Sequence, residues 1–204
     1  MSQQRRRVVQ LVDPIRAGEM SLESAMSARR SVREYDQTPL TVAEVSQLLW
    51  AAQGVTSPRG FRTAPSAGAL YPLLVHIVVG QVDGMEQGVY NYCPAEHDMV
   101  RVAEGDRRLD LATAAYDQEQ VQHAAVVIAL SAAYERIVQK YGQRGVPYTH
   151  MEAGMAAENV HLQAAALGLG TVIMGAFDDD RVRELIELGI NEKPLVLMPV
   201  GRRR

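Results

Sequence analysis

The stretch that decides the fold of this chain is Arg-Arg-Ser-Val-Arg at residues 29–33, together with Pro-Ser-Ala-Gly-Ala-Leu-Tyr-Pro at residues 65–72. The first stretch places three guanidinium groups and a hydroxyl within five residues. Arginine presents a planar fork of N–H donors that matches phosphate oxygens, and it stays charged at any working pH. The second stretch is small and turn-rich, so a flat ligand can lie against its backbone. Together the two stretches predict a site for a phosphorylated, aromatic cofactor.

A simpler interpretation of the arginine cluster stays open. Ser21 is a suitable N-cap for a short helix that runs to Ala28, and cations are favoured at a helix C-terminus by the helix dipole. The cluster would then be only a solvated helix end. Of the 21 Lys and Arg residues, only Lys140 and Lys193 are lysines, so single arginines carry less weight than clusters of them.

The composition is that of an ordinary globular protein, with 47% hydrophobic and 22% charged residues in a chain of 204. We expect residues 1–18, which are polar and contain Pro14, to form an N-terminal arm or a frayed helix, and residues 19–204 to form one domain. The net charge of −3 does not favour nucleic-acid binding. Cys93 is alone, so an internal disulfide is excluded. With no apolar stretch long enough to span a membrane, we expect a cytoplasmic protein.

Hydrophobic periodicity and turn signals predict interspersed helices and strands. Thr-Val-Ala-Glu at residues 41–44 is a capping-box pattern that opens a helix ending at Gly54. The longest predicted helix, residues 148–167, carries apolar residues on nearly all its faces, which is typical of a central, enclosed helix. Few regular βαβ units are present, so we expect an α+β fold. The other helices are predicted over residues 109–116, 132–141 and 179–187, and the strands over 73–79, 88–92, 99–102, 124–130, 171–174 and 195–200.

Three further motifs do not support other chemistry. The glycines of Gly168-x-Gly170 follow a helix and lack a third partner, unlike a dinucleotide-binding fingerprint. Glu158-x-x-His161 has the spacing of a di-metal ligand pair, but a single copy favours a polar pair on a helix face, and we expect no metal. Asp178 and its two acidic neighbours are best explained as a helix cap. No nucleophile-elbow pattern surrounds Ser66, which excludes that class of hydrolase.

Lys140 and Tyr141 allow two interpretations. One is a lysine that caps a helix end before Gly142, beside a tyrosine that only packs. The other is a proton-transfer pair, because desolvation lowers the pKa of a lysine and a tyrosine hydroxyl then relays or donates a proton.

Taken in order, these segments resemble the nitroreductase superfamily of flavoproteins over residues 29–201. The resemblance is carried by residues 29–33, by Pro-Ser-Ala at 65–67, and by Gly-Leu-Gly-Thr-Val-Ile-Met-Gly-Ala-Phe-Asp at 168–178. Residues 65–72, Lys-Tyr-Gly-Gln-Arg-Gly at 140–145 and Met-Glu-Ala-Gly at 151–154 are similar to azoline dehydrogenases of thiazole/oxazole peptide biosynthesis. In that subgroup a Lys-Tyr pair that matches Lys140 and Tyr141 is catalytic.

The resemblance implies an FMN cofactor and a homodimer, with each of two flavin sites built from both chains. Carried over by position, the phosphate and ribityl chain would be held by Arg29, Arg30, Ser31 and Arg33. The partner chain would supply Pro65, Ser66, Ala67 and Ala69 to the ring. Met174, Gly175 and Ala176 would pass the reactive edge, with backbone N–H groups near flavin N5, and Gln118 would face the pyrimidine edge. Arg202 would replace the basic C-terminal tail of many members as a phosphate ligand.

The loop at residues 65–69 departs from the family pattern in two places. Many members have a second serine and an asparagine where this chain has Ala67 and Ala69. Any contact of these positions with a flavin would therefore be made by the backbone or through water.

The expected function is an NADH- or NADPH-driven FMN reductase, working by ping-pong turnover on nitroaromatic, quinone-like or similar flat aromatic acceptors. One alternative is an azoline dehydrogenase, in which Lys140 and Tyr141 transfer the proton while FMN takes a hydride. A second alternative is a flavin-binding module without catalysis. An arginine-rich nucleic-acid binder is disfavoured by the negative net charge.

Overall fold

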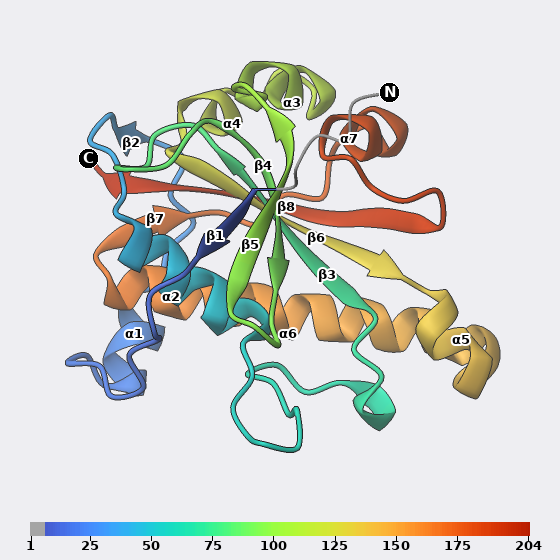
Figure 1. Ribbon diagram of the computed structural model, residues 1–204. Helices are drawn as coiled ribbons and strands as arrows, with labels where there is room; N and C mark the ends of the chain where they lie inside the picture. The colour runs from blue at the N-terminus through green and yellow to red at the C-terminus, as the bar shows by residue number, and fades with distance from the viewer. Residues whose placement is uncertain (1–6) are drawn as a thin grey trace.

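The computed structural model describes residues 7–204. Within them, an antiparallel sheet of eight strands forms the middle layer of the molecule (Figure 1). The strands lie in the order β1-β5-β4-β3-β6-β8-β2, and β7 pairs with β8 beside this path. Their bounds are β1 (Val8–Gln10), β2 (Tyr35–Asp36), β3 (Leu73–Val79), β4 (Gly88–Cys93), β5 (Asp98–Glu104), β6 (Val126–Ala133), β7 (Leu169–Thr171) and β8 (Glu192–Arg203).

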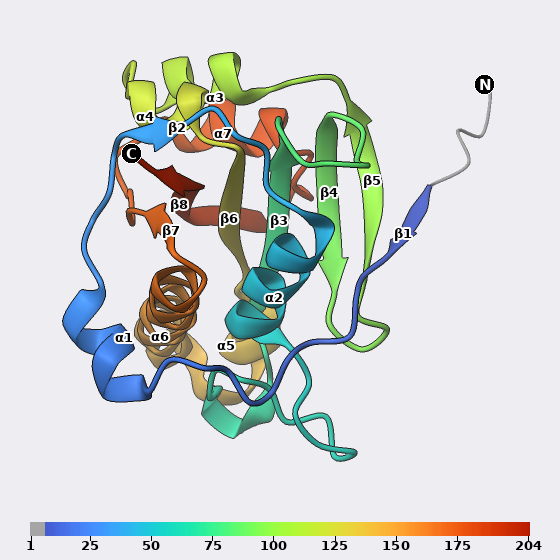
Figure 2. The ribbon, with the colours of Figure 1, turned by 90° about the vertical axis from the view of Figure 1, so that its left-hand side faces the viewer.

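Helices cover both faces of the sheet, so the expected α+β fold is confirmed. Figure 2 shows α2 and α6 on one side and α3, α4 and α7 on the other. The helices are α1 (Leu22–Ala28), α2 (Val42–Gln53), α3 (Arg108–Ala114), α4 (Glu119–His123), α5 (Glu135–Tyr141), α6 (Gly145–Ala166) and α7 (Asp179–Leu185), with short 3-10 turns η1 (Ala67–Ala69) and η2 (Gly142–Arg144).

The central strands β3 and β6 explain the two hydrophobic layers. Successive side chains of a strand point to opposite faces. In β6, Ile128 packs toward α2 and α6, while its neighbours Val127 and Ala129 pack toward α3 and α7. Both faces are buried, and this is why β3 and β6 read as continuous apolar runs in the sequence.

The predicted helix caps are confirmed. The Ser21 hydroxyl accepts a hydrogen bond from the Ser24 N–H at 3.1 Å, and Arg29 follows as the C-cap of α1. At the start of α2, Thr41 and Glu44 form the expected reciprocal capping box. The carboxylate of Asp178 accepts bonds from two backbone N–H groups of α7.

Several predicted boundaries are wrong, each because of a pairing between distant segments. The strand expected at residues 171–174 ends at Thr171, since β7 pairs with residues 200–202 of β8. Strand β8 continues through Arg203, because β7 and β2 extend the sheet beyond Val200. Val8–Gln10 is a strand that pairs with β5, so a frayed helix is excluded there. Residues 1–6 of the predicted arm lie outside the described residues.

Helix α6 is longer than expected, and it is not enclosed on all faces. One face packs against α2 and the sheet. On the opposite face Met151 and Met155 are exposed, at 58% and 41%, and the open position Gly154 lies between them. One chain therefore buries only half of this apolar helix. Over residues 7–204, no helix is both long enough and apolar enough to cross a membrane.

Candidate functional site

The arginine segment is joined to the end of the sheet. The Val32 N–H donates to the Thr171 carbonyl at 2.9 Å, and Ser31 forms a parallel bridge with the same threonine. A Cβ on Gly170 would lie 2.6 Å from Cγ1 of Val32, so this close approach requires glycine. The segment that carries Arg30 and Arg33 is thus attached to β7, which pairs in turn with the end of β8.

The side chains of this segment are differently engaged. Arg29 lies 3.8 Å from the exposed carboxylate of Glu158. Arg30 turns back to donate to the carbonyls of Ser27 and Arg29, at 2.9 and 2.7 Å. Arg33 is exposed and has no ion pair among residues 7–204. At least Arg30 and Arg33 therefore keep their positive charge available to an anion.

Two buried polar groups lie behind the arginines without a partner. His161, on α6, is 3% exposed and its Nδ1 has no hydrogen-bond partner in the described chain. Burial and the charge of Arg29 lower the pKa of His161 to about 4, so the ring is neutral at pH 7. The Thr171 hydroxyl is also buried and unpartnered within the described residues. Buried polar atoms without a hydrogen-bond partner are rare in native proteins, so these two indicate a bound ligand or water.

The turn at Met174–Ala176 lies next along the chain. Met174 is anchored by two backbone hydrogen bonds with Leu197, each 2.9 Å. Gly175 and Ala176 are exposed, and nothing lies within 4 Å of the position of a Cβ on Gly175. The backbone of this turn is therefore accessible, and contact of its N–H groups with a flavin stays a prediction.

Gln118 lies against this turn. Its Nε2 donates to the carbonyls of Ala115 and Ala176, at 2.9 and 3.1 Å, and its Oε1 accepts from Gln120 at 2.9 Å. All its polar atoms are thus engaged within the chain. Contact of Gln118 with a flavin stays a prediction, and it would require release of one of these bonds.

Arg202 and Arg203 point in different directions from the end of β8. Arg202 makes two bonds to the Glu44 carboxylate, at 3.0 and 3.1 Å, and Glu44 also completes the capping box of α2. The Nε of Arg203 donates to the Leu169 carbonyl at 2.9 Å, beside the arginine segment. The phosphate contact expected of Arg202 is untested, and Arg203 has the better position for it.

The loop at residues 65–69 meets Lys140 and Tyr141 at the other end of the molecule. A Cβ on Gly68, which has φ of +63°, would lie 2.9 Å from Lys140 Nζ and 2.7 Å from Tyr141 Oη. The Ser66 hydroxyl accepts a hydrogen bond from the Tyr71 N–H at 2.9 Å, which closes the loop. Lys140 does stand at a helix end before Gly142, and both its side chain and that of Tyr141 reach the loop.

Glu152 of α6 lies beneath this loop. It is 1% exposed, and neither carboxyl oxygen has a hydrogen-bond partner in the described chain. Burial raises the pKa of the Glu152 carboxyl to about 7, although Ser66, Arg62 and Gln53 favour the ionised form. Arg62 itself bonds to Gln53 at 3.0 Å rather than to Glu152.

The predicted residues thus form two groups within one chain. The first, which we call the arginine edge, consists of residues 29–33, Thr171 and the turn 174–176. The second, the lysine–tyrosine loop, consists of residues 65–69, Lys140 and Tyr141. Glu152 and His161 mark the two groups on α6, and at 1.5 Å per residue they stand about 13 Å apart along the helix axis.

Sequence reasoning gave no role to Glu152 and treated His161 only as one of a polar pair. The helical periodicity of the sequence could have pointed to both residues. They lie on the buried stripe of α6 with Ala153, Ala156 and Ala157, where a polar side chain is unusual. No group of three or more metal-ligating side chains occurs within residues 7–204.

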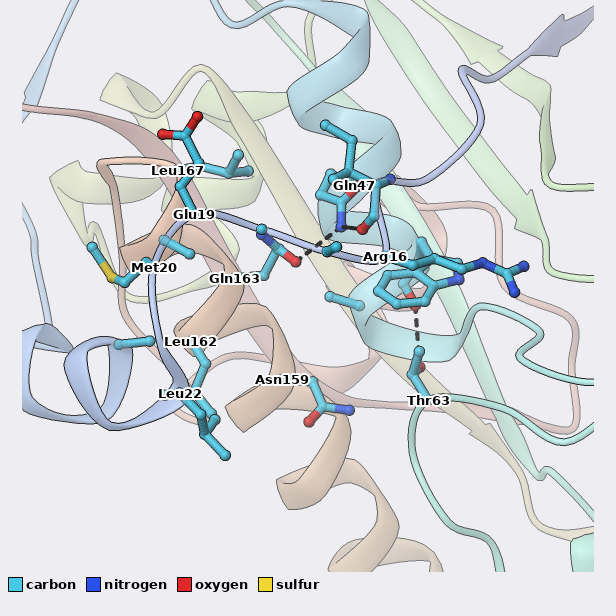
Figure 3. A pocket seen from close by; sticks show the side chains of 17 residues that line it. Arg16, Glu19, Met20, Leu22, Gln47, Thr63, Asn159, Leu162, Gln163 and Leu167 are labelled. Carbon is cyan, nitrogen blue, oxygen red and sulfur yellow. Dashed lines mark hydrogen bonds between the residues drawn. The ribbon is translucent and has the colours of Figure 1, made fainter.

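Figure 3 shows a groove between residues 15–20, α1, α2 and α6. Its volume is about 660 Å³, and the amides of Gln47 and Gln163 meet across it at 3.0 Å. None of the site residues predicted from the sequence lines this groove in the described chain. It adjoins the exposed Leu22 of α1, so it belongs to an uncovered apolar face and not to the predicted site.

The raised pKa of Glu152 predicts a pH-dependent stability. The folded state holds the proton more tightly than the unfolded chain, whose value is near 4.5. The stabilisation is therefore complete below pH 4.5 and is lost as the pH rises toward 7 and above. Relative to Glu152→Gln, we expect the free energy of unfolding of the wild type to fall by roughly 3 kcal/mol between pH 4.5 and 8.

Urea titrations at several pH values measure this difference. His161 acts in the opposite sense, because its lowered pKa costs stability as the pH falls from 6.5 to 4, but it is common to both proteins and cancels. Glu158→Gln removes an exposed carboxylate from the same helix and serves as the control, with a change below about 0.5 kcal/mol. A pH-independent difference between wild type and Glu152→Gln would contradict the assignment.

Comparison with known proteins gives a consistent family. The nitroreductase family model matches residues 26–202. A protein of Methanocaldococcus jannaschii named as a candidate nitroreductase is 50% identical over 185 residues, covering 91% of this chain and 92% of its own. A structure of a candidate nitroreductase from Ralstonia eutropha superposes with a TM-score of 0.86 at 29% identity, covering 97% of this chain and 90% of that chain.

More distant relatives have more specific names. The microcin B17-processing protein of Escherichia coli is 26% identical over 159 residues, 75% of this chain, which spans only 58% of that relative. This match agrees with the expected likeness to the azoline dehydrogenase subgroup. The NADPH:FMN oxidoreductase of Vibrio harveyi, solved with NAD⁺, shares the fold with a TM-score of 0.65 at 21% identity, covering 89% of this chain and 68% of that chain. By the extent of these matches, the chain belongs to the nitroreductase family and is an oxidoreductase.

Proposed function

We propose that this protein is an FMN-dependent oxidoreductase that uses NADH or NADPH to reduce flat aromatic acceptors such as quinones and nitroaromatics. The observation that carries the proposal is the arginine edge. There the pairing of Ser31 and Val32 with Thr171 attaches the arginine segment to β7, and the chain continues from Thr171 to the exposed turn at Gly175 and Ala176.

The residues of the arginine edge fit FMN. Arg30 and Arg33 are exposed cations suited to a phosphate. The unpartnered Thr171 hydroxyl and His161 Nδ1 lie behind them. The extended chain from Thr171 to Gly175 is long enough to lie alongside a ribityl chain. Open space over Gly175 leaves room for a flat ring against exposed backbone N–H groups.

When bound, FMN would take a hydride from the nicotinamide donor and pass its electrons to the acceptor. The chain's own part is to bind and orient. Arg30 and Arg33 neutralise the phosphate, and the backbone of Gly175 and Ala176 presents fixed dipoles to the ring edge. Lys140 and Tyr141 hold protons beside the loop that would meet the same ring from a second copy.

We infer a homodimer from the arrangement of the two groups along α6. Glu152, beneath the lysine–tyrosine loop, and His161, behind the arginine edge, lie about 13 Å apart along the helix axis, so we propose that each ring meets the loop of a second copy. An apolar face made of Leu22, Met26, Met151 and Met155 is exposed, at 40% or more for each residue. Monomeric proteins rarely leave large contiguous apolar faces open. A second copy that covers this face would bring its loop to the arginine edge of the first.

The nicotinamide electron donor is proposed from a protein of the same fold. The Vibrio harveyi structure, named an NADPH:FMN oxidoreductase, holds NAD⁺ on this same fold. NADH and NADPH are therefore both to be tested.

The first test is spectroscopic. We expect purified protein to bind FMN and to show oxidised-flavin absorbance, which NADH or NADPH bleaches without oxygen and a quinone restores. Arg30→Gln/Arg33→Gln is expected to weaken FMN binding about 100-fold or more, because each of the two lost charge-assisted contacts is worth about 1.5–3 kcal/mol. The control Arg107→Gln/Arg181→Gln removes the same charge from the far helix layer.

Two results would contradict the proposal. If the purified protein takes up no FMN, both the proposed cofactor and the proposed function are wrong. Tight FMN binding without bleaching by either nicotinamide would leave only a flavin-binding module.

The second test concerns the dimer. Met151→Glu/Met155→Glu places two charges on the exposed face of α6, where burial against a second copy would be costly. We expect a monomer by analytical ultracentrifugation and loss of FMN in the same variant. Ile190→Glu, at a position 85% exposed and remote from α6, is the control that stays dimeric. Retention of the dimer by the α6 variant would refute this interface.

A second function is favoured by one observation. Lys140 Nζ and Tyr141 Oη both reach Gly68 of the loop, as a proton-transfer pair of an azoline dehydrogenase would. In that reaction the pair removes a ring-carbon proton while a hydride leaves to FMN, and oxygen reoxidises the flavin.

The variant Lys140→Ala separates the two functions. If the protein oxidises a thiazoline, we expect that activity to fall 100-fold or more, the usual scale of a lost general base, while FMN content stays unchanged. If it is a reductase of quinones, kcat for a quinone changes by less than about threefold, since water can supply the proton. No thiazoline oxidation by the wild type would end the alternative.

A further inference from the structure

A surface of cations and aromatic rings surrounds the lysine–tyrosine loop. We call it the α5–α6 corner and define it as Arg136, Lys140, Tyr141, Arg144 and Tyr148. The rings of Tyr141 and Tyr148 meet edge to face with centroids 5.5 Å apart. Arg144 Cζ lies 5.4 Å from the Tyr148 centroid, and Lys140 Nζ lies 5.4 Å from the Tyr141 centroid.

The cations of the corner have no carboxylate partner. Among residues 7–204, none of Arg136, Lys140 and Arg144 is within 4 Å of an acidic oxygen. Arg136 donates one hydrogen bond to the Tyr71 carbonyl at 3.1 Å. All three are exposed, in a chain whose net charge is −3. The α5–α6 corner is therefore locally positive, although the whole chain has a net negative charge.

The acidic groups nearby do not balance the three cations. Glu135 contributes one exposed negative charge and makes no ion pair in the described chain. Glu152 is buried beneath the loop and is partly protonated at neutral pH, because burial raises its pKa to about 7. Arg62 adds a further cation, stacked 4.3 Å over the Tyr71 ring.

The corner lies next to the loop at residues 65–69, because the side chains of Lys140 and Tyr141 lie against Gly68 of that loop. The proposed function puts this loop at the flavin ring, so a substrate that reaches the ring passes over the corner. Reduction of a quinone to a hydroquinone consumes two electrons and two protons. NAD(P)H supplies a hydride, which is two electrons and one proton, and the second proton comes from a protein group or water. Arg136, which bonds to the Tyr71 carbonyl, and Arg144, beside the Tyr148 ring, therefore lie along the path of the acceptor.

We propose that the α5–α6 corner binds an anionic group of the electron acceptor, so that the protein prefers flat aromatic acceptors that carry a carboxylate, sulfonate or phosphate. Arg136 and Arg144 are specificity-determining residues in this role. Arg144 supplies a fork of donors over a tyrosine ring, and Arg136 supplies a second guanidinium at the loop. The inference rests on the proposed function and names the acceptor class for the same site.

The test compares a neutral and an anionic acceptor in FMN-loaded protein: 1,4-naphthoquinone and 1,4-naphthoquinone-2-sulfonate. In Arg136→Gln/Arg144→Gln we expect KM for the sulfonate to rise about tenfold, a loss of about 1.4 kcal/mol. KM for the neutral quinone and both kcat values are expected to stay within twofold. In the wild type, raising the salt from about 0.05 M to about 0.5 M should raise the KM for the sulfonate and leave the KM for the neutral quinone unchanged.

Two variants and one binding measurement make the test decisive. Arg107→Gln/Arg181→Gln, with the same loss of charge on the other helix layer, is expected to leave both acceptors unchanged. Arg144→Gln alone avoids the Arg136 contact with the loop and should give part of the effect. Equilibrium dialysis of anthraquinone-2-sulfonate against the oxidised holoprotein should show the same weakening of Kd without turnover.

The inference is overturned if the double variant changes both acceptors equally, changes neither, or changes only KM for the nicotinamide donor. Failure of the proposed function looks different, since the neutral quinone would then not be reduced by the wild type at all. The dialysis measurement still decides the inference in that case.

Discussion

The predicted site depends on one backbone contact, the hydrogen bond from Val32 N–H to the Thr171 carbonyl. This bond attaches the segment after α1 to β7, and β7 is attached in turn to the end of β8. Without it the arginines would be a flexible helix end, which was the simpler interpretation of the sequence. Gly170 makes the contact possible, because a side chain there would displace Val32. A pairing between residues far apart in the chain thus holds the charged cluster against the sheet.

Helix α6 gives the molecule its second constraint. Its buried stripe carries Glu152 near one end and His161 toward the other, and both are held in their neutral forms to a large extent by burial. Buried ionisable groups without partners lower the stability of a fold and are frequent at functional sites, so Glu152 and His161 support the proposed site. The exposed stripe of the same helix leaves Met151 and Met155 in solvent. One face of α6 therefore packs in the core, and the other leaves the apolar surface on which the proposed dimer depends.

Local signals in the sequence predicted the local structure well. The capping box at Thr41 and Glu44, the cap at Asp178 and the helix end at Lys140 depend on neighbouring residues alone, and all are confirmed. The errors lie where distant segments decide. Thr171–Met174 is as apolar as a strand, yet β7 is shifted because its register is set by β8.

The site shows the same division. The residue types of the arginine segment and of the lysine–tyrosine loop were visible in the sequence. Two contacts were not visible in the sequence: the ion pair of Glu44 with Arg202, and the position of Glu152 beneath Ser66. A carboxylate in a helix does not reveal which distant side chain it meets. The assignments of individual residues to FMN stay predictions.

The place of β8 has a consequence for biosynthesis. Residues 192–203 pair with β6, β7 and β2, all of which leave the ribosome earlier. Until these residues emerge, the nascent chain carries β6 with an open, strongly apolar edge, the type of edge that invites association with other chains. The sheet therefore closes only after β8 has been made, and its closing contacts join segments far apart in the chain, a topology that slows folding. Such a polypeptide would benefit from a chaperone that shields β6 during synthesis.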